Sequence, residues 1–233
     1  ATVRLDDAGA VDALEGFAAG EWWVQDLAAT LPVRVLAARA GERVLDLCAA
    51  PGGKTAQLLA AGAVVTSVER DPGRAARLEA NLARLALSGE IVVADLLDYR
   101  PPAPFPAVLL DAPCTATGTI RRHPDILWTK TAADVATMAT LQRRLLTRAA
   151  SFVGPGGRLV YAVCSLEPEE GPAVVDDFLA TRPDFARLPI GSSETGFAPT
   201  AAGALRPDPA MRAEQGGMDG FFVARLVRTR STD

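Results

Sequence analysis

The sequence predicts an α/β fold, a mostly parallel sheet with helices on both faces and one antiparallel edge strand. From residue 41 onward, short apolar runs alternate with segments of helical periodicity, and parallel strands need crossover helices of this kind. The last two apolar runs, residues 185–188 and 220–227, are separated by a segment without helical periodicity. We therefore expect them to pair as an antiparallel hairpin.

The composition is typical of a globular chain that is large enough for one sizeable domain. It has 233 residues, of which 49% are hydrophobic and 22% charged, and a net charge of -4. The negative charge argues against a protein that coats nucleic acid non-specifically. Three cysteines without a Cys-x-x-Cys pair and a single histidine argue against a disulfide framework or a metal site. With no apolar run of about 18 residues and no signal peptide, we expect a cytoplasmic monomer without membrane contact.

Residues 1–39 are predicted to form a segment that packs on the main domain, residues 40–233. Residues 20–24, Gly-Glu-Trp-Trp-Val, favour a short strand in which both tryptophans are packing residues. Asp26 is a suitable N-cap for a helix that runs to about residue 38 and is interrupted by Pro32.

The main domain is predicted to alternate strands and helices. Before the two strands of the hairpin, further strands are expected at residues 43–47, 64–68, 91–93, 107–110 and 159–163. Helices are expected at residues 55–61, 71–85, 132–152 and 168–181. Asp71 and Pro72 supply an N-cap and a first-turn proline, and Gly-Pro-Gly-Gly at residues 154–157 is a stop signal. Residues 119–131 and 191–217 are expected to be loops.

Two of the predicted strands lead into cysteines. Asp111 and Cys114 follow the apolar run 107–110, and Cys164 follows 159–163. Because parallel sheets collect functional groups at the carboxyl ends of their strands, we expect one site with two thiols and a carboxylate. The alternative is that both cysteines are small buried apolar residues.

A glycine-containing turn connects the first strand to the next helix. It contains Cys48, Ala49, Ala50, Pro51, Gly52, Gly53 and Lys54. Glycines let a ligand approach the backbone, and a helix N-terminus offers free N–H groups. The spacing matches neither Gly-x-Gly-x-x-Gly nor a Walker loop, which argues against dinucleotide and nucleoside triphosphate sites.

Two acidic residues follow the next two strands. Glu69 ends the second predicted strand and can accept hydrogen bonds from ribose hydroxyls, and Asp95 follows the third, where it can accept from an adenine amino group. A nucleoside site without a pyrophosphate loop fits S-adenosylmethionine. The alternative is that both carboxylates are solvated strand ends.

Three motifs stand in order: Leu-Asp-Leu-Cys-Ala-Ala-Pro-Gly-Gly-Lys-Thr at residues 45–55, Asp-Ala-Pro-Cys at 111–114, and Tyr-Ala-Val-Cys-Ser at 161–165. They resemble the Sun-type RNA cytosine-C5 methyltransferase family. Residues 119–128, Thr-Ile-Arg-Arg-His-Pro-Asp-Ile-Leu-Trp, are similar to its Sun/Fmu (RsmB-like) subgroup of bacterial small-subunit ribosomal RNA enzymes. The resemblance implies a Rossmann-like class I S-adenosylmethionine-dependent methyltransferase fold with a seven-stranded sheet. It also implies 16S ribosomal RNA as the substrate.

The resemblance further implies roles for individual residues. It makes Cys164 the nucleophile and Cys114 the group that assists product release. The cofactor contacts that it implies are Cys48, Ala49, Ala50, Pro51, Gly52, Gly53, Lys54, Glu69, Asp95 and Asp111. Thr115 stands where the family usually has serine, and Val163 where it usually has threonine. Bacterial members also carry an N-terminal helical RNA-binding domain, for which 233 residues leave no room.

The chemistry of cytosine explains why such a site needs a thiol. Carbon 5 becomes nucleophilic when a thiolate adds to carbon 6, Asp111 can stabilise charge at ring N3, and the base must leave its stack. Because Pro113-Cys114 resembles the nucleophile position of DNA cytosine-C5 methyltransferases, the choice of Cys164 depends on the RNA family alone. The competing hypotheses are an amino-group methyltransferase, an enzyme for another RNA such as tRNA, and a non-catalytic RNA-binding relative.

The most distinct cluster of basic residues consists of Arg121, Arg122 and His123. We predict that Arg121 and Arg122 contact RNA phosphate, with a solvated surface loop as the alternative. Trp128 either stacks on a base or anchors this loop, and the sequence favours neither.

Overall fold

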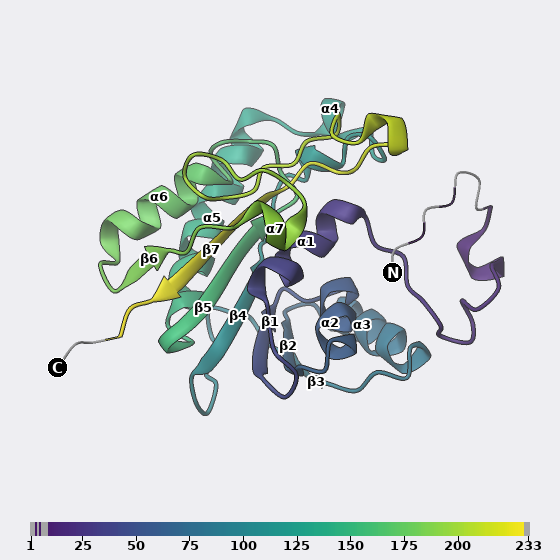
Figure 1. Cartoon of the computed structure of the whole chain (residues 1–233), viewed down its shortest axis with the longest axis horizontal. Helices are drawn as coiled ribbons and strands as arrows, with labels where there is room; N and C mark the ends of the chain where they lie inside the picture. The colour runs from purple at the N-terminus through teal and green to yellow at the C-terminus, as the bar shows by residue number, and fades with distance from the viewer. Residues whose placement is uncertain (1–2, 4, 6–8, 231–233) are drawn as a thin grey trace.

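The computed structural model describes residues 3, 5 and 9–230, and its centre is a seven-stranded sheet in the order β3-β2-β1-β4-β5-β7-β6 (Figure 1). The strands are β1 (Arg43–Leu47), β2 (Val64–Glu69), β3 (Glu90–Val93), β4 (Phe105–Asp111), β5 (Val153–Val163), β6 (Phe185–Arg187) and β7 (Phe222–Arg228). β7 is antiparallel to β5 and β6, and all other neighbouring pairs are parallel. The predicted fold is confirmed. The antiparallel strand β7 lies one place in from the edge, because β6 pairs on its outer side.

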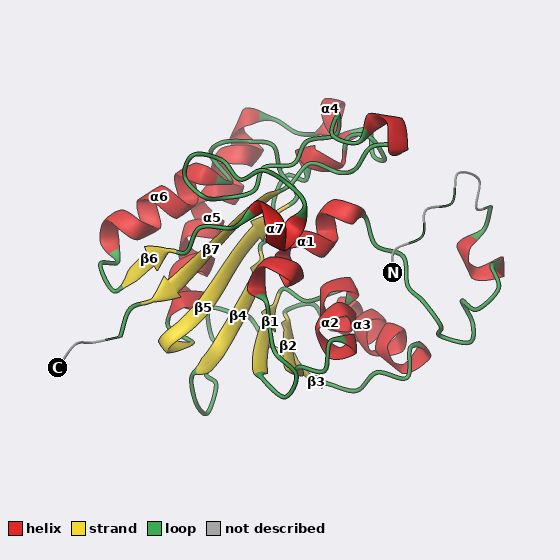
Figure 2. Cartoon of the chain, viewed as in Figure 1, coloured by secondary structure: helices red, strands yellow, loops and turns green. Residues whose placement is uncertain are grey.

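Helices lie on both faces of the sheet (Figure 2). They are α1 (Leu27–Leu36), α2 (Gly53–Ala60), α3 (Pro72–Arg84), α4 (Ile126–Thr129), α5 (Ala132–Ala150), α6 (Pro172–Thr181) and α7 (Ser192–Thr195). Alternate strand residues point to opposite faces. On β4, Val108 and Leu110 therefore pack toward α5 and α6, whereas Ala107 and Leu109 pack toward α1 and α2. None of the described helices is both long and apolar enough to cross a membrane.

Local capping signals are reproduced in the structure. The Asp26 side chain accepts a hydrogen bond from the Ala28 backbone N–H, and Asp71 accepts one from Arg74. The expected interruption at Pro32 is wrong: α1 continues through this residue, because its apolar residues pack in a core shared with β4 and β5. The division of the chain between residues 39 and 40 stays a prediction.

Three expectations about element extents are wrong. Residues 20–24 form no strand. Instead the Trp22 ring packs on Phe17, and the guanidinium of Arg84 donates hydrogen bonds to the backbone carbonyl oxygens of both residues. β5 begins at Val153, before the predicted stop signal, because Val153 pairs with Phe105 and the register then shifts. The predicted loops 119–131 and 191–217 contain the short helices α4 and α7.

Candidate active site

Four neighbouring parallel strands bring the predicted site residues to one edge of the sheet (Figure 1). In the order β2-β1-β4-β5, Glu69 ends β2, Cys48 follows β1, Asp111 ends β4 and Cys164 follows β5. Because these strands run in the same direction, the segments that follow them meet at their carboxyl ends.

The two thiols predicted to act together are in contact. The Cys114 and Cys164 sulfur atoms lie 3.4 Å apart, and both residues are half-buried. The hydrogen bond with Cys114 lowers the pKa of Cys164 in spite of its burial, and the charge of Lys54 lowers it further. The same hydrogen bond, together with burial, raises the pKa of Cys114 well above its usual value. These opposite shifts favour a thiolate at Cys164 over one at Cys114.

An ion pair lies beside the thiols. Lys54 Nζ is 2.7 Å from Asp111 Oδ2, and the Phe221 ring lies 5.3 Å from the same nitrogen. Burial lowers the pKa of Lys54, but the carboxylate of Asp111 outweighs this, so the net pKa is raised and the amine stays charged. The Asp111 side chain is 29% exposed, which leaves it accessible to a ligand.

The turn after β1 is held by contacts on its outer side. The Ala50 N–H donates to Glu69, and the Arg74 guanidinium donates to the Ala50 carbonyl. Gly52 has a φ of +106°, and a Cβ atom there would lie 2.5 Å from the Leu78 side chain. Only glycine therefore fits this position without strain.

The residues around this turn fit S-adenosylmethionine. Glu69 is buried and pairs in register with Val93, so that Asp95 follows on the neighbouring strand. Each carboxylate oxygen can accept more than one hydrogen bond. Among the described residues, the Glu69 side chain accepts hydrogen bonds from the Ala50 and Asp71 N–H groups, and that of Asp95 accepts one from Leu97. Arg74 and Arg70 lie farther off, 3.7 Å from Glu69 and 3.9 Å from Asp95, so both carboxylates retain acceptor capacity. Cys48 is suited to packing, because burial raises its pKa to about 12.

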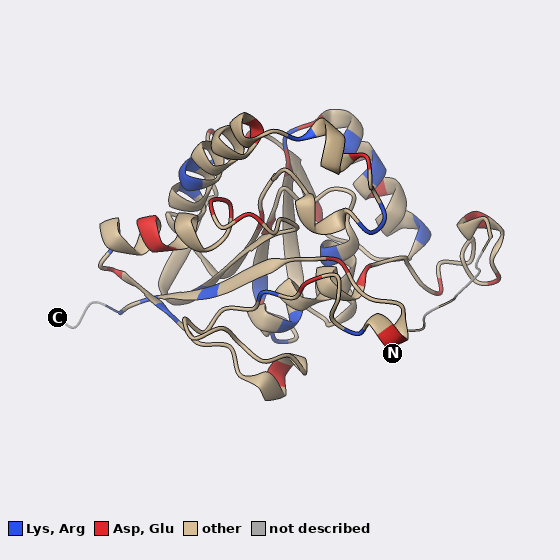
Figure 3. Cartoon of the chain, turned by 90° about the horizontal axis from the view of Figure 1, so that it is seen from above, with Lys and Arg blue, Asp and Glu red and all other residues tan. Residues whose placement is uncertain are grey.

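The predicted RNA-binding arginines are held by internal ion pairs. The Arg122 guanidinium makes a two-oxygen contact with the buried carboxylate of Asp219, and Arg121 reaches both Asp219 and Asp26. Their side chains remain 45% and 32% exposed. Seen from above, Lys and Arg segments are interspersed with Asp and Glu segments (Figure 3). Phosphate contact by Arg121 and Arg122 stays a prediction.

Sequence reasoning missed several residues that build this site. Asp219 lies between the predicted loop 191–217 and the predicted strand 220–227, and Phe221 lies in that strand. Only their contacts with Arg122 and Lys54 reveal a role. Glu170 is one of three acidic residues near the start of α6, but it alone of the three is buried. The one feature of the sequence that could have indicated a role for Glu170 is that it lies six residues after Cys164.

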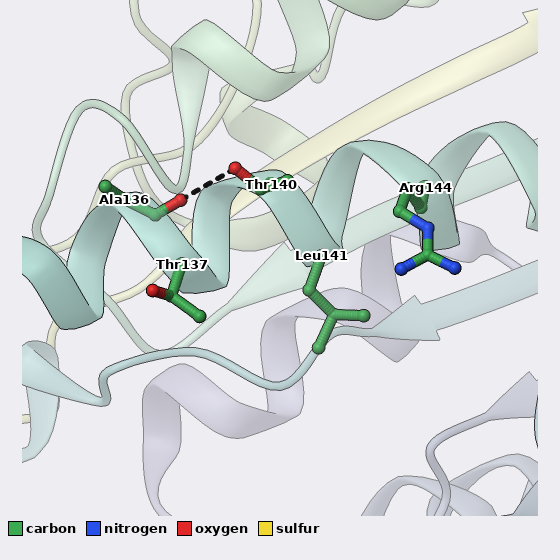
Figure 4. Close-up of a pocket in the computed structure, with 5 residues that line it drawn as sticks. All are labelled: Ala136, Thr137, Thr140, Leu141 and Arg144. Carbon is green, nitrogen blue, oxygen red and sulfur yellow. Dashed lines mark hydrogen bonds between the residues drawn. The ribbon is translucent and has the colours of Figure 1, made fainter.

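A hollow of about 560 Å³ runs along α5, away from these residues (Figure 4). Thr137, Leu141 and Arg144 project toward it, whereas the Thr140 hydroxyl turns back to the Ala136 carbonyl. The hollow is lined by this one helix and contains no thiol or carboxylate. Within the described part of the chain, no group of three or more His, Cys, Asp or Glu side chains is arranged to hold a metal ion.

The fold is similar to those of known methyltransferase structures. The chain is similar to NSun6 from Pyrococcus horikoshii, a structure determined with SFG, with 27% identity, a TM-score of 0.80, and coverage of 96% of this chain and 57% of that one. It is also similar to a methyltransferase homolog protein from Pyrococcus horikoshii, with 29% identity, a TM-score of 0.76, and coverage of 94% and 72%. The fold and the turn after β1 therefore define a Rossmann-like methyltransferase, a class whose cofactor is S-adenosylmethionine.

The family follows from sequence comparison. The family model described as "16S rRNA methyltransferase RsmB/F" matches residues 33–227, and this chain belongs to that family. The ribosomal RNA small subunit methyltransferase B of Salmonella arizonae is 44% identical over 234 residues, which cover 97% of this chain and 51% of that protein. The chain thus spans about half the length of the curated relatives it matches. The resemblance noted from the motifs is confirmed.

Proposed function

We propose that this chain catalyses the methylation of cytosine carbon 5 in 16S ribosomal RNA, with S-adenosylmethionine as methyl donor. The observation that carries the proposal is the pair of thiols 3.4 Å apart beside the Lys54–Asp111 ion pair. The family supports ribosomal RNA as the substrate, and action on ribosomal RNA corresponds to a cytoplasmic enzyme. The neighbour determined with SFG, an analogue of S-adenosylmethionine, supports the cofactor.

In this proposal Cys164 is the nucleophile. Its thiolate forms a bond to carbon 6 of a cytosine that has left its stack, and the electron pair of the 5,6 double bond shifts toward carbon 5 and the N3 side. The ionised Asp111, whose side chain is 29% exposed, relays a proton from solvent to ring N3 as negative charge develops there. Lys54 stabilises the same charge electrostatically, because its buried amine cannot be screened by bulk water.

When bound, S-adenosylmethionine supplies the electrophilic methyl group for carbon 5. The proton on carbon 5 then passes to solvent, and the electron pair of the broken C–H bond re-forms the 5,6 double bond and expels the Cys164 thiolate. Cys114 assists this step by donating its S–H hydrogen bond to the departing sulfur, which stabilises the thiolate as it forms. This division of roles rests on the family resemblance and is supported by the lower pKa of Cys164.

Alanine variants of the two cysteines test the proposal. With target RNA and cofactor, Cys164→Ala should lose both methylation and any covalent RNA–protein species. Cys114→Ala should still form the bond to carbon 6 but release it slowly, so that a covalent complex accumulates on denaturing electrophoresis. Ser193→Ala, an exposed position on α7 away from the thiols, is the control.

Two results would change the proposal in different ways. An adduct in Cys164→Ala that is lost in Cys114→Ala would exchange the roles of the two thiols and leave the reaction class in place. Methylation at the wild-type rate in both variants would show that the cysteines only pack, and it would exclude the covalent mechanism.

A further inference from the structure

Glu170 is a fully buried carboxylate that the proposed mechanism does not use. Its Oε1 accepts hydrogen bonds from the Thr115 backbone N–H at 2.9 Å and from Gln142 Nε2 at 3.0 Å. Its Oε2 accepts from the hydroxyl groups of Thr115 and Ser165. The Tyr161 hydroxyl donates to the Glu170 backbone carbonyl at 2.5 Å, which fixes the main chain there.

The partners of Glu170 flank both reactive thiols. Thr115 follows Cys114 in the chain, and Ser165 follows Cys164. Gln142, on α5, also donates to the carbonyl of Pro113, which precedes Cys114. One carboxylate therefore binds residues on either side of Cys114, directly or through Gln142, and the residue after Cys164.

Additional hydrogen bonds connect the same two turns. The Thr117 and Ser165 hydroxyls lie 3.2 Å apart, and the Leu166 N–H donates to Thr117. The Gly118 N–H donates to the Cys164 carbonyl at 3.0 Å. The turn after β4 and the turn after β5 are therefore joined both directly and through the Glu170 carboxylate.

A buried carboxylate is unfavourable unless donors compensate its charge. Among residues 3, 5 and 9–230, no Lys or Arg forms an ion pair with Glu170. Its compensation comes from neutral donors, so its negative charge acts on its surroundings. The hydrogen bond with Cys164 and burial raise the pKa of Cys114, and the charge of Glu170 raises it further.

We propose that Glu170 is a positioning residue that fixes the two cysteine turns relative to each other and holds Cys114 and Cys164 at hydrogen-bond distance. The inference rests on the proposed function, because it assigns the geometry on which attack and release depend. A misplacement of about 1 Å at a reacting centre can cost about 100-fold in rate. Glu170 thus acts through the cysteines and touches no substrate itself.

The first test needs neither RNA nor activity. In Glu170→Gln the shape is kept, but an amide N–H₂ replaces one acceptor oxygen and the charge is lost. The rate of iodoacetamide alkylation at Cys114 and Cys164 is followed against pH by peptide mass spectrometry. In the wild type Cys164 should react at lower pH than Cys114. In the variant the two profiles should converge. Glu169→Gln, a neighbouring exposed acid, is the matched control and should keep the wild-type profiles.

The second test measures methylation by the same proteins at saturating cofactor. Glu170→Gln should lower kcat about 100-fold, with the affinity for S-adenosylmethionine within about twofold of wild type, because the turn after β1 is untouched. Thr115→Val removes one donor at almost constant volume and should shift the alkylation profiles in the same direction. Thr115→Ser, which keeps the hydroxyl, should shift them less. If Glu170→Gln does not fold, the comparison of Thr115→Val with Thr115→Ser tests the positioning role of Glu170.

Unchanged alkylation profiles, with a normal kcat for each folded molecule, would overturn the inference and leave Glu170 with a purely structural role. The proposed function fails separately, if the wild type forms no bond to cytosine. In that case the alkylation profiles would still decide whether Glu170 positions the thiols.

Discussion

Lys54 shows how much a single side chain depends on its partner. In the chain it belongs to the turn after β1, but its amine pairs with Asp111 at the end of β4. The same charge lies close enough to Cys164 to lower the pKa of that thiol. One lysine therefore connects the turn after β1, the Asp111 carboxylate and the proposed nucleophile, Cys164.

Lys54→Met should remove this electrostatic support. The pKa of Cys164 should rise, because the thiolate loses its cationic neighbour, and alkylation of Cys164 at neutral pH should slow. The methylation kcat should fall about 100- to 1,000-fold, as is typical when a charge-stabilising group is removed. Lys130→Met is the matched control, because Lys130 is the other lysine and is exposed. Equal alkylation rates in the two variants would contradict this role.

Glu69→Gln should weaken cofactor binding. A hydrogen bond to a charged group contributes about 1.5–3 kcal/mol, so the dissociation constant for S-adenosylmethionine should rise about tenfold or more. Calorimetric titration measures it, with Glu79→Gln on the exposed face of α3 as the control. Titrations indistinguishable from wild type would remove Glu69 from the cofactor site.

At the scale of elements, β1 and α2 are connected by a buried hydrogen bond beneath the glycine turn. Thr55 Oγ1 donates to Asp46 Oδ2 at 2.6 Å, while Asp46 Oδ1 is buried without a partner. Burial raises the pKa of Asp46 from 3.8 to about 7. The folded protein therefore holds this proton more tightly than the unfolded chain, which stabilises it fully below pH 3.8 and progressively less as the pH rises to about 7.

Asp46→Asn should remove this dependence. Above pH 7 the wild type holds a buried charge that the variant lacks, so the variant should unfold less readily. Each pH unit between the two pKa values corresponds to about 1.4 kcal/mol, so the advantage of the variant in unfolding free energy should grow by at most roughly 3 kcal/mol between pH 5 and pH 8. Urea denaturation of both proteins at pH 5 and pH 8 measures it. A difference that is the same at both pH values would show that Asp46 does not carry the proton.

At the scale of the whole molecule, one network joins three distant segments. Asp219, which precedes β7, binds Arg121 and Arg122 in the loop after β4, and its N–H donates to Asp26 at the start of α1. Asp219 is 1% exposed, so its charge depends on these arginines. The predicted phosphate-binding cluster thus also has a structural role.

The two roles can be separated by the salt dependence of RNA binding. If Arg121 and Arg122 contact phosphate, changing both to Ala should flatten the slope of log affinity against log salt by about 1.4, since each phosphate contact with a single strand contributes about 0.7. Arg143 and Arg144 on α5, changed together to Ala, are the control. A slope equal to that of the control would leave the cluster with its structural role alone.

The same arginine variant should be less stable without RNA. Leaving the buried Asp219 carboxylate unpaired costs about 1–3 kcal/mol of unfolding free energy. We expect a value toward the lower end of this range, because the Arg122 side chain is 45% exposed. A melting temperature equal to that of the wild type would show that the network does not support the fold.

The sequence by itself determined what depends on near neighbours in the chain. Asp26 and Asp71 cap helices where predicted, and β1 covers the predicted residues, because capping and strand formation act over a few positions. The approach of Cys114 to Cys164 was expected, because parallel strands deliver their ends to one edge.

Only the tertiary structure decided the contacts that connect distant segments. The Lys54–Asp111 pair, the four donors on Glu170 and the binding of Arg122 to Asp219 join residues that are between 5 and 97 positions apart. No local pattern distinguishes Glu170 from the exposed Glu169 beside it. Its proposed role depends on burial, which results from the packing of α5 and α6 against the sheet. A buried carboxylate is stable only where the fold supplies hydrogen-bond donors, and here these donors come from distant parts of the chain.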